Sequence, residues 1–346
     1  MGAWHGVLYL RFMQVHRFID KLPVFKNAVI TIGTFDGVHL GHQQIIKQLK
    51  EEALRIDGET VIITFHPHPR AVVASGKPTY LLTTLNEKII LLREFGVDHV
   101  VVVPFDENFS NQTPEAYVQH FLYEKFKPHT LIIGYDHRFG KNRKGDYHLL
   151  ENMGKELGFV VKEIPEQVIN AVTVSSTRIR EALLKSDVQA ANSYLGYNYF
   201  FEGMVIDGNK LGRTLGYPTA NIIIHDENKL VPSNGIYVAE AEIEEKSIPN
   251  SQWSMEEEHG EPSTIYHARL KGMMSIGVRP TVDGKNRTIE MNIFDFGEDI
   301  YGYTMKIFVC AYLRPEEKFN SLDELKLRID KDKEDSLEYF FKNGKS

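Results

Sequence analysis

The chain has 346 residues, of which 42% are hydrophobic and 25% are charged. This is ordinary globular composition with enough apolar material for two buried cores, so two domains are expected. A formal net charge of −7 argues against a protein that spreads over the phosphate backbone of nucleic acid, and any anionic ligand must be held by a local site.

The single cysteine, Cys310, lies in the apolar run KIFVCAYL. No internal disulfide can form, which favours a reducing cytoplasm, and we expect Cys310 to be a core residue. No apolar run approaches the roughly 20 residues of a membrane span, so no membrane association is expected. Residues 1–12 are interpreted as an extension ahead of a fold that begins near Met13.

Between Ala28 and Ile164, short β-branched runs alternate with helical patterns. The predicted strands are AVITIG (28–33), TVIITF (60–65), DHVVVVPF (98–105), TLIIGYD (130–136) and FVVKEI (159–164). Near-continuous apolar strands suit a sheet buried on both faces, and their alternation with helices predicts an α/β doubly wound parallel sheet, Rossmann-like in class. A ligand of such a sheet is expected at the carboxyl ends of its strands.

Two helices of this region carry clear signals. Residues 42–56 place an apolar stripe on one helical face, formed by Ile45, Ile46, Leu49, Ala53 and Ile56. Thr113 followed by Pro114 predicts an N-cap with proline at the first helical position.

The stretch TIGTFDGVHLGHQQII (31–46) runs from a strand through a glycine turn into a helix. The first amides of a helix lack internal partners and the helix dipole favours anions there, so phosphate is the expected ligand. His39 and His42 are three residues apart and can face the same way, where imidazolium or neutral N–H groups stabilise charge on a phosphoryl oxygen. A histidine pair alone is more typical of an incidental turn, but the whole string G-x-F-D-G-x-H-x-G-H favours a site.

Two further stretches of this half have competing interpretations. VSSTRIREAL opens a helix with hydroxyl caps and a guanidinium one turn later, which suits triphosphate oxygens, although alone it is more typical of an N-cap. In TFHPHPR, His66 and His68 permit a metal site, but their alternation on a proline-bearing strand end favours a structural or flavin-lining role.

After the helical stretch 175–196 the pattern changes to strands without intervening helices. The predicted strands are YFFEGMVIDG (199–208), TANIIIH (219–225), GIYVAEAEI (235–243), YHARLKGMMSIG (266–277), RTIEMNIFDF (287–296) and TMKIFVCAYL (304–313). Six such strands predict a small antiparallel β-barrel. The domains are therefore predicted as 13–185 and 186–346, with residues 245–262 as an exposed loop within the barrel.

The chain ends in an amphipathic helix. Ser321 and Glu324 form a capping-box pattern at its start. Its run of alternating charges is interpreted as a solvated face and not as a binding surface.

The segment GMVIDGNKLGRTLGYPTANI (203–222) is rich in glycine and contains two cations, but its spacing is not that of a Walker A loop. A glycine-rich flap of this kind can cover phosphates, and a flexible hairpin is the alternative. Thr219 and Asn221, two apart on a strand, project the same way and can supply oxygen ligands for Mg²⁺.

Glu290 is the candidate general base of this half. A primary hydroxyl becomes nucleophilic only when a base accepts its proton. The apolar alternation Ile289, Met291, Ile293 leaves Glu290 on the opposite face of its strand together with Asn292. Periodicity alone would favour an ordinary solvated strand residue.

These motifs resemble a known family. Residues 33–42 resemble the HxGH signature of the nucleotidylyltransferase superfamily, and with SSTRIR and IIGYDHRFGKNRKGD (132–146) they are similar to the adenylyltransferase half of bacterial bifunctional riboflavin kinase/FAD synthetases. Six further segments resemble, in the same order, the riboflavin kinase half of that family: LGRTLGYPTANI, NGIYVA, IGVRPT, TIEMNIFDF, DIYG and LRPEEKF. The resemblance covers residues 13 to about 340.

The resemblance implies that ATP phosphorylates riboflavin to FMN and that ATP then adenylylates FMN to FAD with release of pyrophosphate. In the first half, His39, His42 and Arg180 would stabilise the transferring phosphates, and ATP would be bound by Gly33, Thr34, Phe35, Asp36, Gly41, Asp136, Ser175, Ser176 and Thr177. In the barrel, Glu290 would be the base, Thr219 and Asn221 would hold Mg²⁺, and Gly208, Lys210, Gly212 and Pro218 would bind ATP. Flavin contacts are implied for Arg314, in a loop over the flavin, and for Phe139.

The family often has a histidine after the acid, where this sequence has Met291, Asn292 and Ile293. Two alternatives stay open: an enzyme that retains one of the two activities, and a nucleic-acid-binding or flavin-sensing regulator that uses barrel aromatics such as Phe200, Phe201 and Tyr217. No nucleic-acid partner is expected, and the protein is expected to be a cytoplasmic monomer or weak homo-oligomer.

Overall fold

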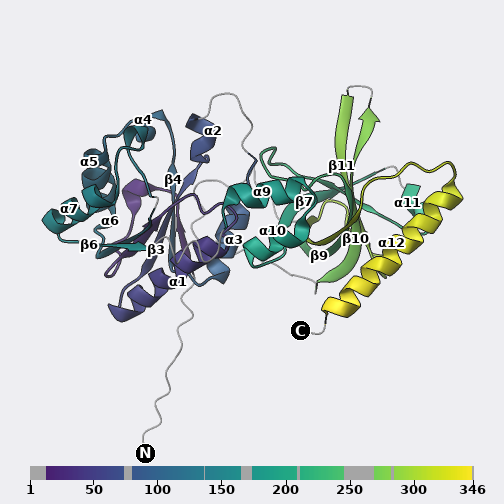
Figure 1. Cartoon of the computed structure of the whole chain (residues 1–346), viewed down its shortest axis with the longest axis horizontal. Coiled ribbons are helices and arrows are strands. Elements are labelled where there is room, and N and C mark those ends of the chain that lie inside the picture. Colours follow the sequence, from purple (N-terminus) through teal and green to yellow (C-terminus); the bar gives the residue numbers. More distant parts are fainter. Residues whose placement is uncertain are drawn as a thin grey trace, which may run out of the picture. The chain divides into compact units, whose positions relative to one another are not determined.

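The computed structural model in Figure 1 describes residues 13–73, 80–135, 137–164, 174–208, 211–244, 269–281 and 284–344. The chain forms two compact units, Met1–Ser176 and Thr177–Ser346. Four sequence expectations fall outside the described residues: Asp136, Lys210, the extension 1–12 and the loop 245–262.

Unit 1 contains a six-stranded sheet in the order β1-β4-β3-β2-β5-β6, in which every pair is parallel. Its strands are β1 (Gln14–His16), β2 (Val29–Ile32), β3 (Thr60–His66), β4 (His99–Pro104), β5 (Thr130–Gly134) and β6 (Val160–Ile164). The predicted doubly wound parallel sheet is thus confirmed. The sequence did not indicate β1, which has three residues and therefore no measurable periodicity.

The helices of unit 1 lie on both sides of this sheet (Figure 1). They are α1 (Leu40–Arg55), α2 (Pro69–Val73), α3 (Leu85–Glu94), α4 (Glu107–Ser110), α5 (Pro114–Ala116), α6 (Glu124–Phe126) and α7 (Tyr147–Leu157), with a π-helical segment Tyr117–Tyr123 and 3-10 turns at Ile19–Lys21 and Lys141–Arg143. Of the predicted stripe on α1, Ile46, Leu49 and Ala53 are buried. Thr113 caps α5 as expected, with its hydroxyl accepting from the amide of Ala116 at 3.2 Å.

Unit 2 contains a closed barrel in the order β10-β11-β8-β7-β12-β9, with antiparallel neighbours. The strands are β7 (Phe200–Ile206), β8 (Ala220–Ile223), β9 (Gly235–Glu244), β10 (Leu270–Thr281), β11 (Gly284–Ile293) and β12 (Thr304–Arg314). Its helices are α9 (Ser176–Leu184), α10 (Val188–Leu195), α11 (Leu211–Thr214) and α12 (Leu322–Asn343). The predicted antiparallel barrel with a C-terminal helix is confirmed.

The helical stretch 175–196 is two helices, because the chain turns at Ser186, whose φ is +63°. The end of α9 is tied to the segment before β9: the carbonyl of Leu183 accepts from the amide of Ser233 at 3.2 Å, and the hydroxyls of Ser186 and Ser233 lie 2.6 Å apart. By these contacts most of α9 belongs with the barrel, so unit 2 begins at Thr177.

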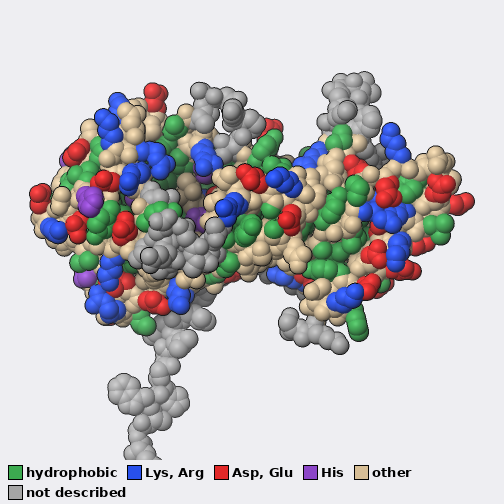
Figure 2. All heavy atoms as spheres, in the orientation of Figure 1, with side chains coloured by type: hydrophobic (Ala, Val, Ile, Leu, Met, Phe, Trp, Pro, Cys, Tyr) green, Lys and Arg blue, Asp and Glu red, His purple; other side chains and the backbone are tan. Residues whose placement is uncertain are grey.

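The C-terminal helix α12 begins as the sequence indicates, although its cap differs in one bond. Ser321 accepts from the amide of Glu324 at 3.1 Å, while the Glu324 carboxylate accepts from the amide of Asn320 instead of that of Ser321. Acidic and basic side chains alternate over α12 in Figure 2, with ion pairs such as Lys331–Asp335 at 3.0 Å. The expected solvated face is confirmed.

Cys310 is 6% exposed and packs with Val238 and Phe340, which confirms its place in the core. Burial raises the pKa of its thiol to about 12, so the thiol is protonated and unreactive at neutral pH. Within the described part of the chain, no helix has the length and hydropathy needed to cross a membrane.

Candidate active sites

The turn between β2 and α1 carries the longest sequence motif. Three of its residues have positive φ, +47° at Phe35, +81° at Gly37 and +34° at Val38. Positive φ is unfavourable for Phe and Val, and such backbone strain concentrates at functional sites. His39 is the N-cap of α1, so the motif lies where the free amides of the helix are, as the sequence predicts.

The two histidines form a stacked pair, with ring centroids 3.7 Å apart and planes inclined by 13°. Nδ1 of His39 accepts from the backbone amide of His42 at 3.4 Å. A neutral ring that accepts at Nδ1 carries its proton on Nε2, so Nε2 is the donor nitrogen of His39. A side chain at Gly41 would place Cβ 3.3 Å from the His39 ring, which explains the glycine.

His42 is neutral at physiological pH. Burial, the neighbouring His39 and then Lys88 hold its pKa well below the ordinary value of 6.5. Its Nδ1 is buried and has no hydrogen-bond partner among the described residues. Of the two possibilities that the sequence left open, imidazolium or a neutral N–H group, the structure favours the neutral ring for His42.

Asp36 fastens a second loop to this turn. The carboxylate is 1% exposed, and Oδ1 accepts from the amides of Leu82 and Thr83 at 2.9 and 3.0 Å. Ser176 also reaches the turn, since its hydroxyl donates to the carbonyl of Asp36 at 3.0 Å. The structure thus gives Asp36 a role in building the site, and it brings Ser176 to the motif.

The remaining predicted residues of this half lie as follows. Gly33 donates to the Ile63 carbonyl at 3.1 Å, and the Thr34 carbonyl accepts from Thr64 at 3.2 Å, so both hold the turn against β3. The Phe35 ring is buried against His42, with centroids 4.9 Å apart. Ser175 directly precedes α9, and Thr177 and Arg180 lie on α9 in unit 2, so their part in the site remains a prediction.

Phe139 does not lie at a surface. It is 6% exposed and belongs to the core cluster of unit 1, where its ring stacks on that of Tyr117 with centroids 5.0 Å apart. This position serves packing, and the flavin contact implied for Phe139 remains a prediction.

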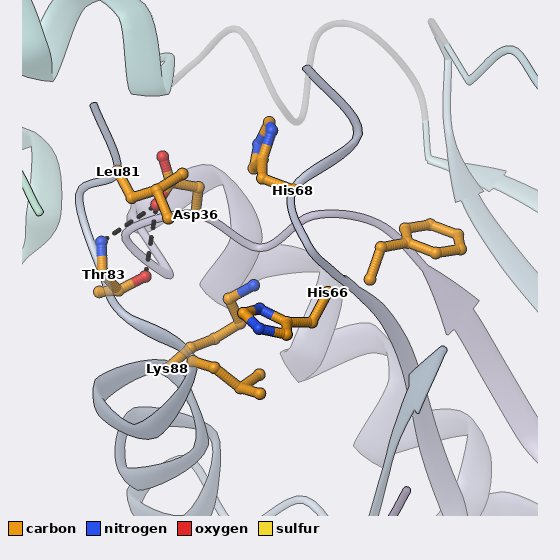
Figure 3. A pocket seen from close by; sticks show the side chains of 8 residues that line it. Asp36, His66, His68, Leu81, Thr83 and Lys88 are labelled. Atoms are coloured by element: carbon orange, nitrogen blue, oxygen red, sulfur yellow. Dashed lines mark hydrogen bonds between the residues drawn. The ribbon is translucent and has the colours of Figure 1, made fainter. Parts of the chain in front are cut away.

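A small pocket opens beside the histidine motif (Figure 3). It is lined by Asp36, Phe65, His66, His68, Leu81, Thr83, Leu85 and Lys88. Figure 3 shows the ammonium of Lys88 directed from α3 toward the space between Asp36 and His66. Sequence reasoning missed Lys88, because one lysine in an amphipathic helix looks like a surface residue. The residues described include no cluster of three His, Cys, Asp or Glu that could hold a metal, so the metal alternative for His66 and His68 gains no support.

In the barrel, Glu290 of β11 meets the start of β8. Thr219 donates its hydroxyl hydrogen to Oε2 of Glu290 at 3.2 Å, and Asn221 is the register partner of Glu290 across the two strands. Asn292 donates to the carbonyl of Pro218 at 2.7 Å, which fixes the segment ahead of Thr219. The structure therefore brings together Thr219, Asn221 and Glu290, the three predicted reactive residues of this half.

The glycine-rich segment approaches this group closely. A Cβ at Gly208 would lie 2.0 Å from Nδ2 of Asn221, and one at Gly212 would lie 2.2 Å from the carbonyl oxygen of Tyr217. Glycine at both positions is what allows the segment to pack here. The segment contains the short helix α11, which the alternative of a flexible hairpin did not include. The hydroxyl of Tyr217 hydrogen-bonds Asp330 on α12.

The donor set of the barrel suits Mg²⁺. A hydroxyl, an amide oxygen and a carboxylate are hard oxygen ligands, and magnesium is usually held by one or two protein oxygens together with water and substrate phosphates. The Thr219 hydroxyl donates to Glu290, which leaves its lone pairs available to a cation.

The position expected for Arg314 is wrong. It is the last residue of β12, where it pairs with Ile236 of β9, and it is not part of a loop. Its guanidinium is held in a bidentate pair with Asp332 of α12 at 2.8 and 2.6 Å. The side chain is 7% exposed, and a third nitrogen donates to the carbonyl of Pro315 at 3.0 Å. Its structural effect is to join the barrel to α12.

Comparison with known proteins gives two family matches, to FAD synthetase over residues 22–178 and to riboflavin kinase over residues 195–340. The chain is 34% identical over 317 residues to the bifunctional riboflavin kinase/FMN adenylyltransferase of Haemophilus influenzae, covering 92% of this chain and 96% of that protein. Its counterpart in Bacillus subtilis is 35% identical, with 91% and 93% covered. A crystal structure described as a macrolide-efflux protein from Streptococcus pneumoniae is 27% identical, covers 93% of this chain and 98% of that one, and superposes with a TM-score of 0.76.

Proposed function

The chain belongs to the bifunctional riboflavin kinase/FMN adenylyltransferase family, and we propose that each of its two units carries one of the two reactions. It is an enzyme with both activities: it phosphorylates riboflavin to FMN and adenylylates FMN to FAD. The substrates are riboflavin, FMN and ATP, and FAD is the final product. The histidine motif of unit 1 suits adenylyl transfer, and the Glu290 group of unit 2 suits phosphorylation.

In unit 1, a phosphate oxygen of FMN attacks the α-phosphorus of ATP, and pyrophosphate leaves. Charge grows on the phosphoryl oxygens, and the free amides at the start of α1 together with the Nε2–H of His39 are donors for it. His42 offers a second neutral donor. Arg180 is proposed to add a guanidinium from α9. No covalent intermediate on the protein is required, because the phosphate oxygen of FMN attacks the α-phosphorus of ATP directly.

In unit 2, the ribityl hydroxyl of riboflavin attacks the γ-phosphorus of ATP, the bond between the γ-phosphorus and the bridging oxygen breaks, and ADP leaves. Glu290 is proposed to accept the hydroxyl proton as the bond forms. The hydrogen bond from Thr219 to Oε2 orients the carboxylate. Gly208, Gly212 and Pro218 are proposed to shape the ATP-binding segment, together with Lys210.

Mg²⁺ is the proposed metal, held by Thr219 and Asn221. When bound, it would neutralise charge on the transferred phosphates. The support lies in the oxygen chemistry of these side chains and in their meeting beside Glu290.

We also propose a cytoplasmic location and a monomeric or weakly associating state. The location is supported by the single, buried cysteine and by bacterial relatives. Light scattering coupled to gel filtration would test the assembly, with a mass near 39.7 kDa expected.

One observation carries the proposed division of labour: the stacked His39–His42 pair lies at a helix N-terminus in unit 1, while the Thr219–Glu290 pair lies in unit 2. The test is to incubate the purified chain with riboflavin and Mg-ATP and to separate the flavins by chromatography. FMN should appear first and FAD after it. Absence of both products would refute the proposed function.

A further inference from the structure

Lys88 is an unusual residue for the interior of unit 1. Helix α3 begins with a complete capping box, in which Thr84 and Glu87 bond each other's backbone amides, so the orientation of its first turns is fixed. Lys88 follows directly on the inner face and is only 5% exposed. Burying an ammonium group is unfavourable unless charged or polar partners replace its water, so a lysine in this position needs an explanation.

The protein itself supplies few partners for this ammonium. Among the residues that the structure describes, its hydrogen-bond partner is the hydroxyl of Thr64, at 3.2 Å. The carboxylate of Asp36 attracts it electrostatically, but Oδ1 of Asp36 is already occupied by the amides of Leu82 and Thr83. An ammonium has three N–H donors, so this one retains capacity for a further acceptor.

The Lys88 ammonium, which can donate to a further acceptor, faces the pocket of Figure 3. Lys88 lines this pocket together with Asp36, Thr83, His66 and His68. The pocket follows the carboxyl ends of β2 and β3, where ligands of α/β sheets bind. Its enclosed volume of about 10 Å³ is the space of roughly one water-sized group. It therefore admits an oxygen of an anion.

Lys88 also acts on the histidine motif. Its charge is one of the causes that lower the pKa of His42, so the ammonium and the imidazole influence the same region of space. An anion that enters this region is attracted by both groups. Burial lowers the pKa of Lys88 itself to about 8, which leaves it mostly protonated at pH 7.

We propose that Lys88 binds a phosphate oxygen of a substrate during adenylyl transfer and is a further catalytic residue of unit 1. The proposal rests on the adenylyltransferase function proposed above. The ligand chemistry is a phosphate oxyanion, which either FMN or ATP can supply. In the absence of substrate, Thr64 and Asp36 hold the ammonium in place; with substrate, the phosphate oxygen becomes its additional acceptor.

The test measures FAD formation from supplied FMN by Lys88→Met, which removes the charge and keeps most of the side-chain length. Lys47→Met is the matched control, because Lys47 is an exposed lysine on α1. Loss of one preorganised donor to a reacting oxyanion lowers kcat/KM by roughly 10²-fold, and this loss is expected for Lys88→Met alone. Varying FMN and ATP separately identifies the phosphate: a raised KM for one of them assigns the contact to that substrate.

Riboflavin kinase activity of the same preparation reports whether the variant is folded. Equal FAD formation by Lys88→Met and Lys47→Met overturns the proposal, while an unmodified protein that makes no FAD at all refutes the proposed function instead. Should Lys88→Met also lose kinase activity, the unmodified protein provides a second test. Its KM for the contacted substrate should rise as the pH increases from 7 to 9, and a constant KM would overturn the proposal.

The pH test is selective for Lys88. The other groups around it are the carboxylate of Asp36 and the imidazoles of His42, His66 and His68. Carboxylic acids, imidazoles and phosphate monoesters ordinarily complete their titration below about pH 7.5. Lys88→Arg, which stays charged, should show no rise of KM across the same range.

Discussion

The two sites of this chain are assembled in different ways. In unit 1, most of the motif is contiguous, and the turn from β2 into α1 brings Asp36, His39 and His42 together within a few residues. In unit 2, Thr219 and Glu290 are 71 residues apart, and the antiparallel register of β8 and β11 makes them neighbours. The first arrangement depends on local backbone shape and the second on closure of a barrel.

This difference has a chemical counterpart. The donors of unit 1 are buried or half-buried, and burial, the neighbouring His39 and then Lys88 lower the basicity of His42. They are suited to receiving negative charge. The carboxylate of unit 2 is half-buried and accepts a hydrogen bond from one hydroxyl, which suits a group that must take up a proton.

The largest effect is expected from Glu290→Gln, which removes the base and preserves the shape of the side chain. FMN formation should fall by about 10²- to 10⁴-fold, while FAD formation from supplied FMN persists. Chromatographic assays of the two reactions check this. Glu298→Gln, at an exposed glutamate, is the control. Loss of both activities would show that the separation of the two sites is wrong.

His39→Ala should have the opposite selectivity. Removing the Nε2–H donor and the N-cap is expected to lower FAD formation by roughly 10²- to 10³-fold. Riboflavin phosphorylation should remain near that of the unmodified chain. His120→Ala, at an exposed position of unit 1, serves as control. An unchanged rate of FAD formation would remove His39 from the mechanism.

The stability of Lys88→Met tests whether the buried ammonium of unit 1 is unfavourable for folding. The pKa of Lys88 is lowered from 10.5 to about 8 in the folded chain, so between these values the unfolded chain binds more protons and stability rises with pH. Below pH 8 the buried charge costs up to about 3 kcal/mol of unfolding free energy. Lys88→Met should therefore be more stable at pH 7 and lack the rise between pH 8 and 10.5.

Urea unfolding of unit 1 at pH 7 and at pH 10, followed by circular dichroism, measures this difference. Lys47→Met should behave like the unmodified chain. A destabilised Lys88→Met at pH 7 would mean that the ammonium contributes to the fold and is not held at a cost for function.

The smallest effect is expected from Gly208→Ala. The added Cβ would lie 2.0 Å from Nδ2 of Asn221, so the side-chain amide of Asn221 must shift from its position beside Glu290. A shift of this size is expected to lower the kcat of riboflavin phosphorylation by about tenfold and to leave FAD formation unchanged. Gly297→Ala is the matched control, since a Cβ there meets nothing within 4 Å. Equal kinetics of the two variants would show that the close approach of Gly208 to Asn221 does not matter for riboflavin phosphorylation.

The sequence predicted what depends on short-range patterns. Alternation of strands and helices gave the parallel sheet, and the run of turn-separated strands gave the barrel. The N-cap at Thr113 followed from residue type and spacing alone. The contiguous histidine motif could be located for the same reason.

What the sequence did not reveal depends on contacts between distant elements. Lys88 looks like a surface residue until the packing of α3 against Thr64 is known. The resemblance placed Arg314 in a loop, and its ion pair with Asp332 could not be foreseen because Asp332 lies on another element. Within the helical stretch 175–196 the sequence did not indicate the break between two helices, because the left-handed residue Ser186 is not a glycine.

The most direct test of two separate sites mixes two variants of the full chain, each inactive in one of the two reactions. Glu290→Gln and His39→Ala are each incubated with riboflavin and Mg-ATP, alone and together, and FAD is measured by chromatography. Neither variant alone should form appreciable FAD, whereas the mixture should, because FMN made by His39→Ala is adenylylated by Glu290→Gln. A mixture that forms FMN but no more FAD than the separate variants would contradict the assignment of one reaction to each unit.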